Sequence, residues 1–262
     1  VAAGFMSQWM ETFAIANGLH PVKEDGSINF DKKKTIEMLE TYKALVEMSP
    51  EGIHHWQNGR DFYASDVVPL TFWASYLLDD IAGTRDNVPI MVDDNPQSLA
   101  LAQDTNVIVG MAGPSNPDGG TWVEVHNFGV TVDANTDEAA AFIEYVMNEE
   151  YVTWLGMAPE GSFPIRPGPS AGSKIFIDEW GNLPIGVDRK IPINQIYSNE
   201  IIESLINGLA VGTRWGAKEG QLPVAAKLVN SGLMNRLMME YINGDRSAED
   251  TVDMLNSEAA KL

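Results

Sequence analysis

The stretch "FGVTVDANTDEAAAFIEYVMNEEYVTWLGMA", residues 128–158, sets the expectation for the fold. Residues 128–132 have the short apolar alternation of a strand. An Asx/Thr turn follows, and apolar residues then recur at helical spacing over 137–148 and over 149–157. Because strands that alternate with helices are typical of α/β proteins, the sequence predicts that fold class.

Other helices are predicted by their start signals. Asp31 is placed to cap a helix over 32–48, and "SAED" at 247–250 is a capping box that opens a last helix reaching Leu262. Residues 221–243 read as one long helical region. The Pro- and Gly-rich connector at 159–172 cannot be helical.

The segment "VVPLTFWASYLLDD", residues 67–80, predicts a strand, a tryptophan and then a helix. The apolar run 67–72 ends at Trp73, and the helix is expected to start at Ala74. Ligands of open α/β sheets bind at the carboxyl ends of strands, and the first N–H groups of a helix are free to bind them. Trp73 and Tyr76 are therefore candidate ligand-binding residues.

The charge of the chain excludes several classes of partner. Its 262 residues include 37 acidic and 17 basic ones, for a formal net charge of −20. Such a surface repels phosphate backbones and anionic lipid, so we expect no nucleic-acid partner. No window approaches about 18 consecutive apolar residues, so we expect no membrane insertion. The absence of cysteine excludes disulfides, thiol catalysis and iron–sulfur clusters.

Motifs of catalysis and metal binding are missing. The chain has no G-x-S-x-G, H-E-x-x-H, P-loop or G-x-G-x-x-G sequence. Residues 25–31 alternate faintly like a calcium loop but lack its Gly and Glu, and His54 and His55 are adjacent, a spacing that rarely serves one ion. We therefore expect no catalytic residue, metal or cofactor. Paired carboxylates are plentiful, so a glycoside hydrolase stays an alternative.

Three of the seven tryptophans suggest a binding surface. Trp9, Trp73 and Trp215 stand outside the periodic apolar patterns that normally accompany a buried indole, and Gly212 and Gly216 bracket Trp215. A pyranose packs its C–H face on an indole while polar side chains reach its hydroxyls, so these residues suit a sugar. The alternative for each is an ordinary place in the core.

The order of these features resembles the extracellular solute-binding proteins of ABC sugar importers, in the family-1 group that includes maltose- and oligosaccharide-binding proteins. Thr71–Phe72–Trp73 matches the motif at the end of an apolar strand in that family. A helix pair is matched by 135–154, a "G-lPvr" connector by 161–166 and a C-terminal helix start by 244–252. The matches extend over nearly the whole chain.

The resemblance implies a two-lobed periplasmic-binding-protein type II fold that closes on its ligand by a hinge. Most of this chain would form the C-terminal lobe, as residues 1–127 and 169–262. Residues 128–168 would be a crossing strand and helices that return to the N-terminal lobe. The chain lacks the long N-terminal part that builds most of that lobe in the family. We therefore expect a missing N-terminal segment or a second chain as a partner.

The resemblance also implies site residues and a function. Trp73 and Trp215 match cleft aromatics, and Trp9 is a third candidate. His126 and Asn127 precede the crossing strand, where the family contacts ligand hydroxyls, and Arg214 and Glu124 are weaker candidates.

The implied function is capture of a mono- or oligosaccharide outside the cytoplasm, in the periplasm or anchored at the cell surface. The sugar passes to the transmembrane subunits of an ABC permease, with no bond chemistry. A non-sugar solute, such as a polyamine or a compatible solute, is a further alternative. An anionic ligand would need Arg214, Arg166 or Lys218 in the cleft.

Overall fold

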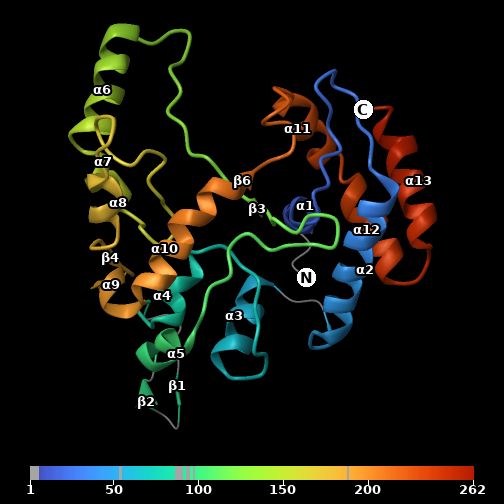
Figure 1. Cartoon of the computed structure of the whole chain (residues 1–262), viewed down its shortest axis with the longest axis horizontal. Coiled ribbons are helices and arrows are strands. Elements are labelled where there is room, and N and C mark those ends of the chain that lie inside the picture. The colour runs from blue at the N-terminus through green and yellow to red at the C-terminus, as the bar shows by residue number, and fades with distance from the viewer. Residues whose placement is uncertain (1–5, 53–54, 86–90, 93–94, 97, 188) are drawn as a thin grey trace. The chain divides into compact units, whose positions relative to one another are not determined.

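The computed structural model describes residues 6–52, 55–85, 91–92, 95–96, 98–187 and 189–262 (Figure 1). The fold is mixed α/β, with roughly half of the chain in helices and few strands. The chain divides into two compact units, and each is described by itself. Unit 1 comprises Val1–Trp56, Ile108–Glu124 and Asn207–Leu262, and unit 2 comprises Gln57–Val107 and Val125–Ile206.

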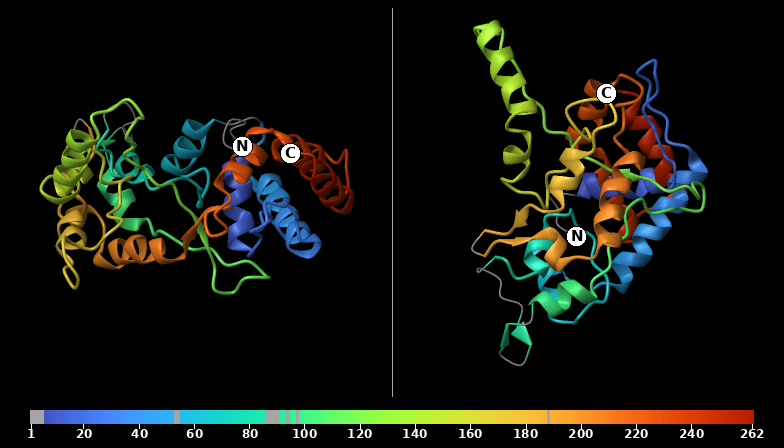
Figure 2. Two further views of the ribbon diagram at one scale, coloured as in Figure 1. Left: turned by 90° about the horizontal axis from the view of Figure 1, so that it is seen from above. Right: turned by 60° about the vertical axis from the view of Figure 1, so that its left-hand side comes forward.

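Unit 1 is a group of helices around one apolar core. Its elements are α1 (Met6–Ala16), α2 (Lys32–Met48), β3 (Thr121–Trp122), η2 (Leu209–Val211), β6 (Gly212–Thr213), α11 (Leu222–Asn230), α12 (Leu233–Ile242) and α13 (Ala248–Ala259). Helix α12 packs against α13 and α2, and the three lie side by side in Figure 2. The core includes Ile15, Leu39, Leu228, Leu237 and Leu255, all buried.

The predicted helix starts in unit 1 are confirmed. The Asp31 carboxylate accepts a hydrogen bond from the Lys34 backbone N–H at 2.9 Å, and the Ser247 hydroxyl accepts one from the Asp250 N–H at 3.1 Å. The long helix predicted over 221–243 is instead two helices, because Gly232 has φ +70° and ends the helical path between α11 and α12.

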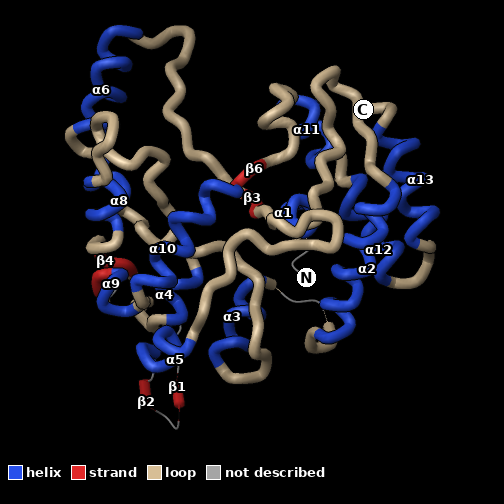
Figure 3. Tube along the Cα trace, viewed as in Figure 1, coloured by secondary structure: helices blue, strands red, loops and turns tan. Residues whose placement is uncertain are grey.

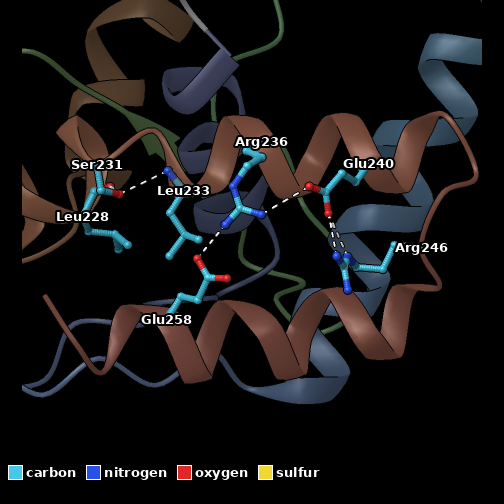
Figure 4. A network of polar contacts seen from close by, with 7 residues as sticks. All are labelled: Leu228, Ser231, Leu233, Arg236, Glu240, Arg246 and Glu258. Atoms are coloured by element: carbon cyan, nitrogen blue, oxygen red, sulfur yellow. Dashed lines mark hydrogen bonds and ion pairs between the residues drawn. The ribbon is translucent and has the colours of Figure 1, made fainter.

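A polar network joins α12, α13 and the turn between them (Figure 4). Arg236 donates to Glu240 at 3.2 Å on its own helix and to Glu258 of α13 at 2.5 Å. Arg246 donates two bonds to one oxygen of Glu240, at 2.9 and 2.7 Å. These pairs lie on the solvent side of the helices, so each adds little to the free energy of unfolding. Their main effect is to orient α12 against α13.

Unit 2 is built from short helices and two antiparallel strand pairs, β1–β2 and β4–β5. Figure 3 shows how much of its chain is loop. Its elements are α3 (Trp56–Ala64), α4 (Leu77–Ile81), β1 (Met91–Val92), β2 (Asn95–Pro96), α5 (Ser98–Asp104), α6 (Thr136–Asn148), α7 (Tyr151–Leu155), α8 (Ile175–Trp180), β4 (Pro184–Ile185), β5 (Ile191–Pro192), α9 (Ile193–Ile196) and α10 (Asn199–Gly208).

Two predicted strands of unit 2 are not formed. In the run 67–72, the N–H groups of Val67 and Val68 donate to the Phe62 carbonyl at 2.9 and 3.2 Å and so close the end of α3. This turn, with Asp66 at φ +60°, takes the backbone groups that a strand would need, and the helix after it begins at Leu77 instead of Ala74. The segment 128–132 is also loop.

The boundaries of the two units differ from those expected along the chain. Residues 57–107 and all of 169–206 group with 128–168 instead of with the rest of the chain. Three kinds of contact hold them together. The Tyr76 ring lies against Gly161, the Tyr197 hydroxyl donates to the Leu78 carbonyl at 2.6 Å, and the Tyr151 and Phe176 rings meet at 4.7 Å.

Candidate functional site

The candidate site lies in unit 1, where β3 and β6 form a short parallel pair next to α1 (Figure 1). Trp122 pairs with Thr213 across this pair. Gly120 allows β3 to approach α1, because a Cβ at this position would be 2.8 Å from the Ile15 side chain. The chain leaves both strands at their carboxyl ends, so Trp122 and Arg214 emerge at the same edge.

Glu11 of α1 holds this edge together. Its side chain is buried, at 2% exposed, yet both of its oxygens have N–H donors. The Trp215 backbone N–H donates to one oxygen at 2.7 Å, and the Trp122 indole N–H donates to the other at 3.2 Å. Burial raises the pKa of the Glu11 carboxyl, while the bond from Trp215 and the nearby Arg214 guanidinium oppose that rise. The carboxylate therefore fixes the orientation of the Trp122 ring.

Arg214 lies on the other side of this indole. Its guanidinium carbon is 4.9 Å from the centre of the Trp122 ring, within the range of a cation–π contact. Both side chains are half-buried, so each keeps part of its surface in solvent. We call Glu11, Trp122 and Arg214 the Trp122 cluster.

Trp215 is a core residue, and the expectation of an exposed indole in a loop is wrong. It is 1% exposed, its indole N–H donates to the Leu19 carbonyl at 2.9 Å, and its ring meets Phe30 edge-on at 6.0 Å. The glycines that suggested exposure serve the backbone instead. Gly216 has φ +75°, and a Cβ there would be 2.6 Å from the Gln221 carbonyl oxygen, so the chain turns there only with glycine.

Trp9 lies on α1 but is not part of the Trp122 cluster. It is half-buried against the core of unit 1. Trp9 and Glu11 are two residues apart on a helix, so they point about 200° apart around its axis. Trp9 therefore belongs to the opposite side of α1 from the carboxylate that holds Trp122.

The predicted polar residues after β3 are all exposed. Glu124 ends the second segment of unit 1, while His126 and Asn127 lie near the start of the second segment of unit 2. The Asn127 amide donates to the Val125 carbonyl at 3.2 Å. The described structure gives these side chains no further partner that would fix them, so they are available to a ligand but are not held in place for one.

Trp73 and Tyr76 lie in unit 2, just before α4. Trp73 is half-buried in a loop, and Tyr76 is exposed at the start of the turn into α4. The Tyr76 ring packs against Gly161, where an added Cβ would lie 2.1 Å from two ring carbons. Tyr76 therefore connects the loop before α4 with the Pro- and Gly-rich connector at 159–172.

Among its described residues, unit 2 buries three carboxylates that the sequence did not single out for a role. Arg85 bonds Asp79 at 2.6 Å, and Arg60 bonds Asp80 at 3.3 Å. Burial and then Asp79 raise the pKa of Asp80; burial also raises the pKa of Glu160, with a further rise from Asp79.

Asp79, Asp80 and Glu160 are too deeply buried to reach a substrate, so we interpret them as structural. Among the described residues, no group of three or more His, Asp or Glu side chains has the geometry to hold a metal ion. Residues 1–5 and His54 lie outside the described residues, while His55 lies within them.

A pocket of about 340 Å³ lies elsewhere in unit 1, between the turn at 26–28, α11 and the end of α13. It contains none of the predicted site residues. Its described lining includes the charged Lys227 and the polar Ser27, and the other lining residues are apolar or glycine. We do not assign it a function.

Comparison with known proteins finds no family model and no curated protein sequence that matches this chain. In the described part of the chain, none of the helices has both the length and the apolar character required to cross a bilayer.

The sequence reasoning missed Trp122, which is the aromatic residue of the cluster. Its signal was present in "TWVEVHN", residues 121–127, where Trp122 alternates with apolar residues and comes just before three predicted polar ligands. Glu11 was also missed, because a carboxylate in the middle of a helix with apolar neighbours gives no sign that it accepts hydrogen bonds from distant segments.

Proposed function

We propose that this chain is the carbohydrate-binding protein of an ABC importer. In this proposal it captures a mono- or oligosaccharide outside the cytoplasm, between two lobes that close on a hinge, and delivers the sugar to the permease. The observation that carries the proposal is the half-buried Trp122 indole, whose N–H is fixed by buried Glu11 and whose ring borders the Arg214 guanidinium. A rigid aromatic surface beside planar N–H donors is well suited to a sugar.

Each part of the Trp122 cluster has a role in this proposal. The indole offers an apolar face to the C–H groups of a pyranose, and Arg214 offers donors to its oxygens. Glu11 keeps the ring in one orientation before the ligand arrives, which lowers the ordering cost of binding. A dissociation constant in the micromolar range corresponds to a binding free energy of about −8 kcal/mol, which stacking and a few charge-assisted hydrogen bonds can supply.

The proposal is tested by titrating the intrinsic tryptophan fluorescence with a panel of mono- and oligosaccharides. We expect at least one sugar to change the emission. The Trp122→Ala variant should lose this binding while keeping the circular dichroism spectrum of a folded chain. The Trp154→Phe variant is the matched control, because Trp154 is half-buried in unit 2 and packs near Tyr151 and Phe128. No response to any sugar would refute the proposal.

Trp73 provides a second test of the sugar site. We expect Trp73→Ala to weaken sugar binding with a melting temperature near that of the wild type. A large loss of melting temperature with binding intact would make Trp73 a packing residue of unit 2.

The hydrolase alternative is separated from the proposal by incubating the chain with each oligosaccharide that binds. Mass spectrometry of the incubated sugar should show it unchanged. Cleaved products that disappear in a variant of one carboxylate would favour a glycosidase instead.

We also propose that a sheet from another segment of the same protein, or from a second chain, covers one apolar face of unit 2. Val132 is 97% exposed and Phe142 is 58% exposed, and Phe128 and Val130 are exposed beside them in sequence. Extended apolar backbone of this kind is suited to pairing with a sheet edge.

Amide hydrogen exchange tests the proposal that a sheet covers this apolar face of unit 2. For the chain by itself, we expect the amides of 129–132 to exchange without protection, because no strand pairs with them in the described structure. Strong protection at these amides would show that the segment already has a partner within the chain, and the proposal of a covering sheet would be wrong.

A further inference from the structure

Arg214 is unusual among the arginines of this acidic chain. Arg60, Arg85, Arg236 and Arg246 each form an ion pair with a carboxylate. Arg214 forms no ion pair with any residue that the structure describes, and its contact is the aromatic face of Trp122. In a chain with 37 acidic and 17 basic residues, an unpaired guanidinium at a half-buried position requires an explanation.

The nearby carboxylate does not remove the need for a partner. Glu11 is within electrostatic reach of Arg214, but Trp215 and Trp122 already donate to both of its oxygens. Burial raises the pKa of Glu11, which weakens it further as a counter-charge. The Arg214 guanidinium therefore has no paired carboxylate among the described residues.

The backbone maintains this arrangement. Thr213 and Trp215 are buried, and Arg214 between them is half-exposed, as expected for the alternation of an extended segment. The Arg214 carbonyl accepts the Ala217 N–H at 3.2 Å, in the turn that Gly216 allows. The side chain is therefore directed outward by the fold and supported by the Trp122 ring.

Arg166 of unit 2 makes a useful contrast. Its guanidinium lies 5.4 Å from the Tyr151 ring and 5.2 Å from the Phe176 ring, and it donates to the Asn148 amide oxygen at 3.1 Å. Arg166 is thus held between two rings and hydrogen-bonded within its unit. Arg214 has one ring contact, and its guanidinium N–H groups have no hydrogen-bond acceptor among the described residues.

We propose that the sugar recognised by the Trp122 cluster is acidic: a uronic acid, or an oligosaccharide that contains one, whose carboxylate pairs with Arg214 while its ring packs on the exposed part of the indole. This inference rests on the proposed function and names its ligand class. A planar guanidinium can bond both oxygens of one carboxylate, which a neutral hydroxyl cannot match. Stacking on Trp122 restricts the orientation of the Arg214 guanidinium before a carboxylate forms two hydrogen bonds with it.

The overall charge of −20 does not prevent this pairing. Repulsion of an anion by distant acidic residues is screened beyond roughly 8 Å at physiological ionic strength. The contact of a carboxylate with Arg214 is much shorter, so it keeps its strength when the long-range field is screened. The test is therefore made at one fixed, physiological ionic strength.

The experiment compares matched neutral and acidic sugars by isothermal titration calorimetry: glucose with glucuronate, galactose with galacturonate, and short oligogalacturonates with the corresponding neutral oligosaccharides. Citrate serves as an acid that is not a sugar. We expect at least one acidic sugar to bind about tenfold or more tightly than its neutral partner. Citrate should bind at least about tenfold more weakly than that sugar.

Variants of Arg214 assign the preference to its guanidinium. Arg214→Gln should reduce the difference between acidic and neutral sugars to less than about threefold, and Arg214→Lys should keep only part of it because an ammonium lacks the planar fork. Arg236→Gln is the matched control, since Arg236 lies in the network between α12 and α13 and should leave the preference unchanged.

The outcomes separate this inference from the function on which it rests. If neutral sugars bind as tightly as their acidic partners, the acidic ligand class is wrong and the sugar-binding function stands. If no sugar of either kind binds, both are wrong. If citrate binds more tightly than every uronate, the site recognises an organic acid and the inference is overturned. The comparison in the wild-type chain decides these cases even if a variant fails to fold.

Discussion

Unit 1 and unit 2 both bury carboxylate side chains, and they satisfy them to different extents. Glu11 of unit 1 receives an N–H donor on each of its oxygens. In unit 2, one oxygen of Asp79 and one oxygen of Glu160 are buried without a hydrogen-bond partner in the described structure. A buried carboxylate organises a site when its oxygens are all bonded, and it weakens the fold when they are not.

The two units also differ in their apolar surfaces. Among the described residues of unit 1, twenty buried side chains form one continuous core drawn from its first and last chain segments, and Trp122 of the middle segment packs against it. Unit 2 exposes Val130, Val132 and Phe142 within a short stretch of chain. Unit 1 therefore has the internal packing of an independent structure, whereas unit 2 carries an apolar face that lacks a cover among the described residues.

The largest effect is expected from removing the central aromatic residue of unit 1. Trp215→Ala should lower the free energy of unfolding by about 3–5 kcal/mol, because it creates a cavity and leaves the Leu19 carbonyl without its donor. Chemical denaturation followed by circular dichroism measures this loss. Trp154→Ala is the control for a half-buried indole, and a loss at Trp215 no larger than at Trp154 would contradict the difference between core and surface.

The same chemical change at two buried carboxylates should have opposite effects. Glu11→Met should lower the free energy of unfolding by about 1–3 kcal/mol, because the buried Trp215 N–H and the Trp122 indole N–H lose their acceptor. The measurement is the denaturation midpoint at pH 7. A variant as stable as the wild type would mean that these N–H groups find other acceptors, and that Glu11 does not fix the Trp122 ring.

Glu160→Met should instead raise the free energy of unfolding by about 1 kcal/mol at pH 7, because it removes a buried carboxylate with an unpartnered oxygen. The wild-type chain holds the Glu160 proton more tightly when folded, since the pKa is raised above its ordinary value of 4.5. The tighter proton binding adds to the free energy of unfolding of the wild type. This stabilisation is fully present below pH 4.5 and is lost as the pH rises through the raised pKa of Glu160.

Melting temperatures of the wild type and the Glu160→Met variant across that pH range test the sign. The variant should lose less stability than the wild type as the pH rises. Parallel curves, or a less stable variant at pH 7, would show that Glu160 is better satisfied than its described contacts indicate.

The smallest effect is expected on the exposed apolar face of unit 2. Phe142→Ser should change the free energy of unfolding by less than about 0.5 kcal/mol, because the side chain is mostly in solvent. Binding of a hydrophobic fluorescent dye should fall, since the variant removes part of the apolar patch. A loss of several kcal/mol would mean that Phe142 is packed in solution and would remove the contrast between the units.

Capping signals in the sequence predicted the starts of α2 and α13 correctly, whereas α4 begins three residues later than predicted. The caps at Asp31 and Ser247 were found from their side-chain chemistry, which acts within three residues. The strands at 67–72 and 128–132 were predicted and are not formed, because a strand also needs a neighbouring strand that local pattern cannot supply. Gly232 divides a helix that apolar spacing alone predicts to be continuous.

The candidate site was predicted in part. Arg214 was recognised, but its neighbour Trp215 was interpreted as exposed because two glycines flank it. The glycines are required by a turn, a fact that depends on the close approach of Gln221. Trp122 and Glu11 escaped notice because their contact joins residues that are 111 positions apart, and no local pattern reports such a pairing.

The alternation of Thr213, Arg214 and Trp215 has a consequence for the tolerance of this segment to insertions and deletions. Loss of a single residue between η2 and Gly216 would exchange the inward and outward positions. The guanidinium would then be pushed into the core and the indole out into water, so one deletion would disrupt both the packing and the proposed ligand-binding surface. Homologous chains that keep this function should vary in length elsewhere and preserve the spacing from Gly212 to Gly216.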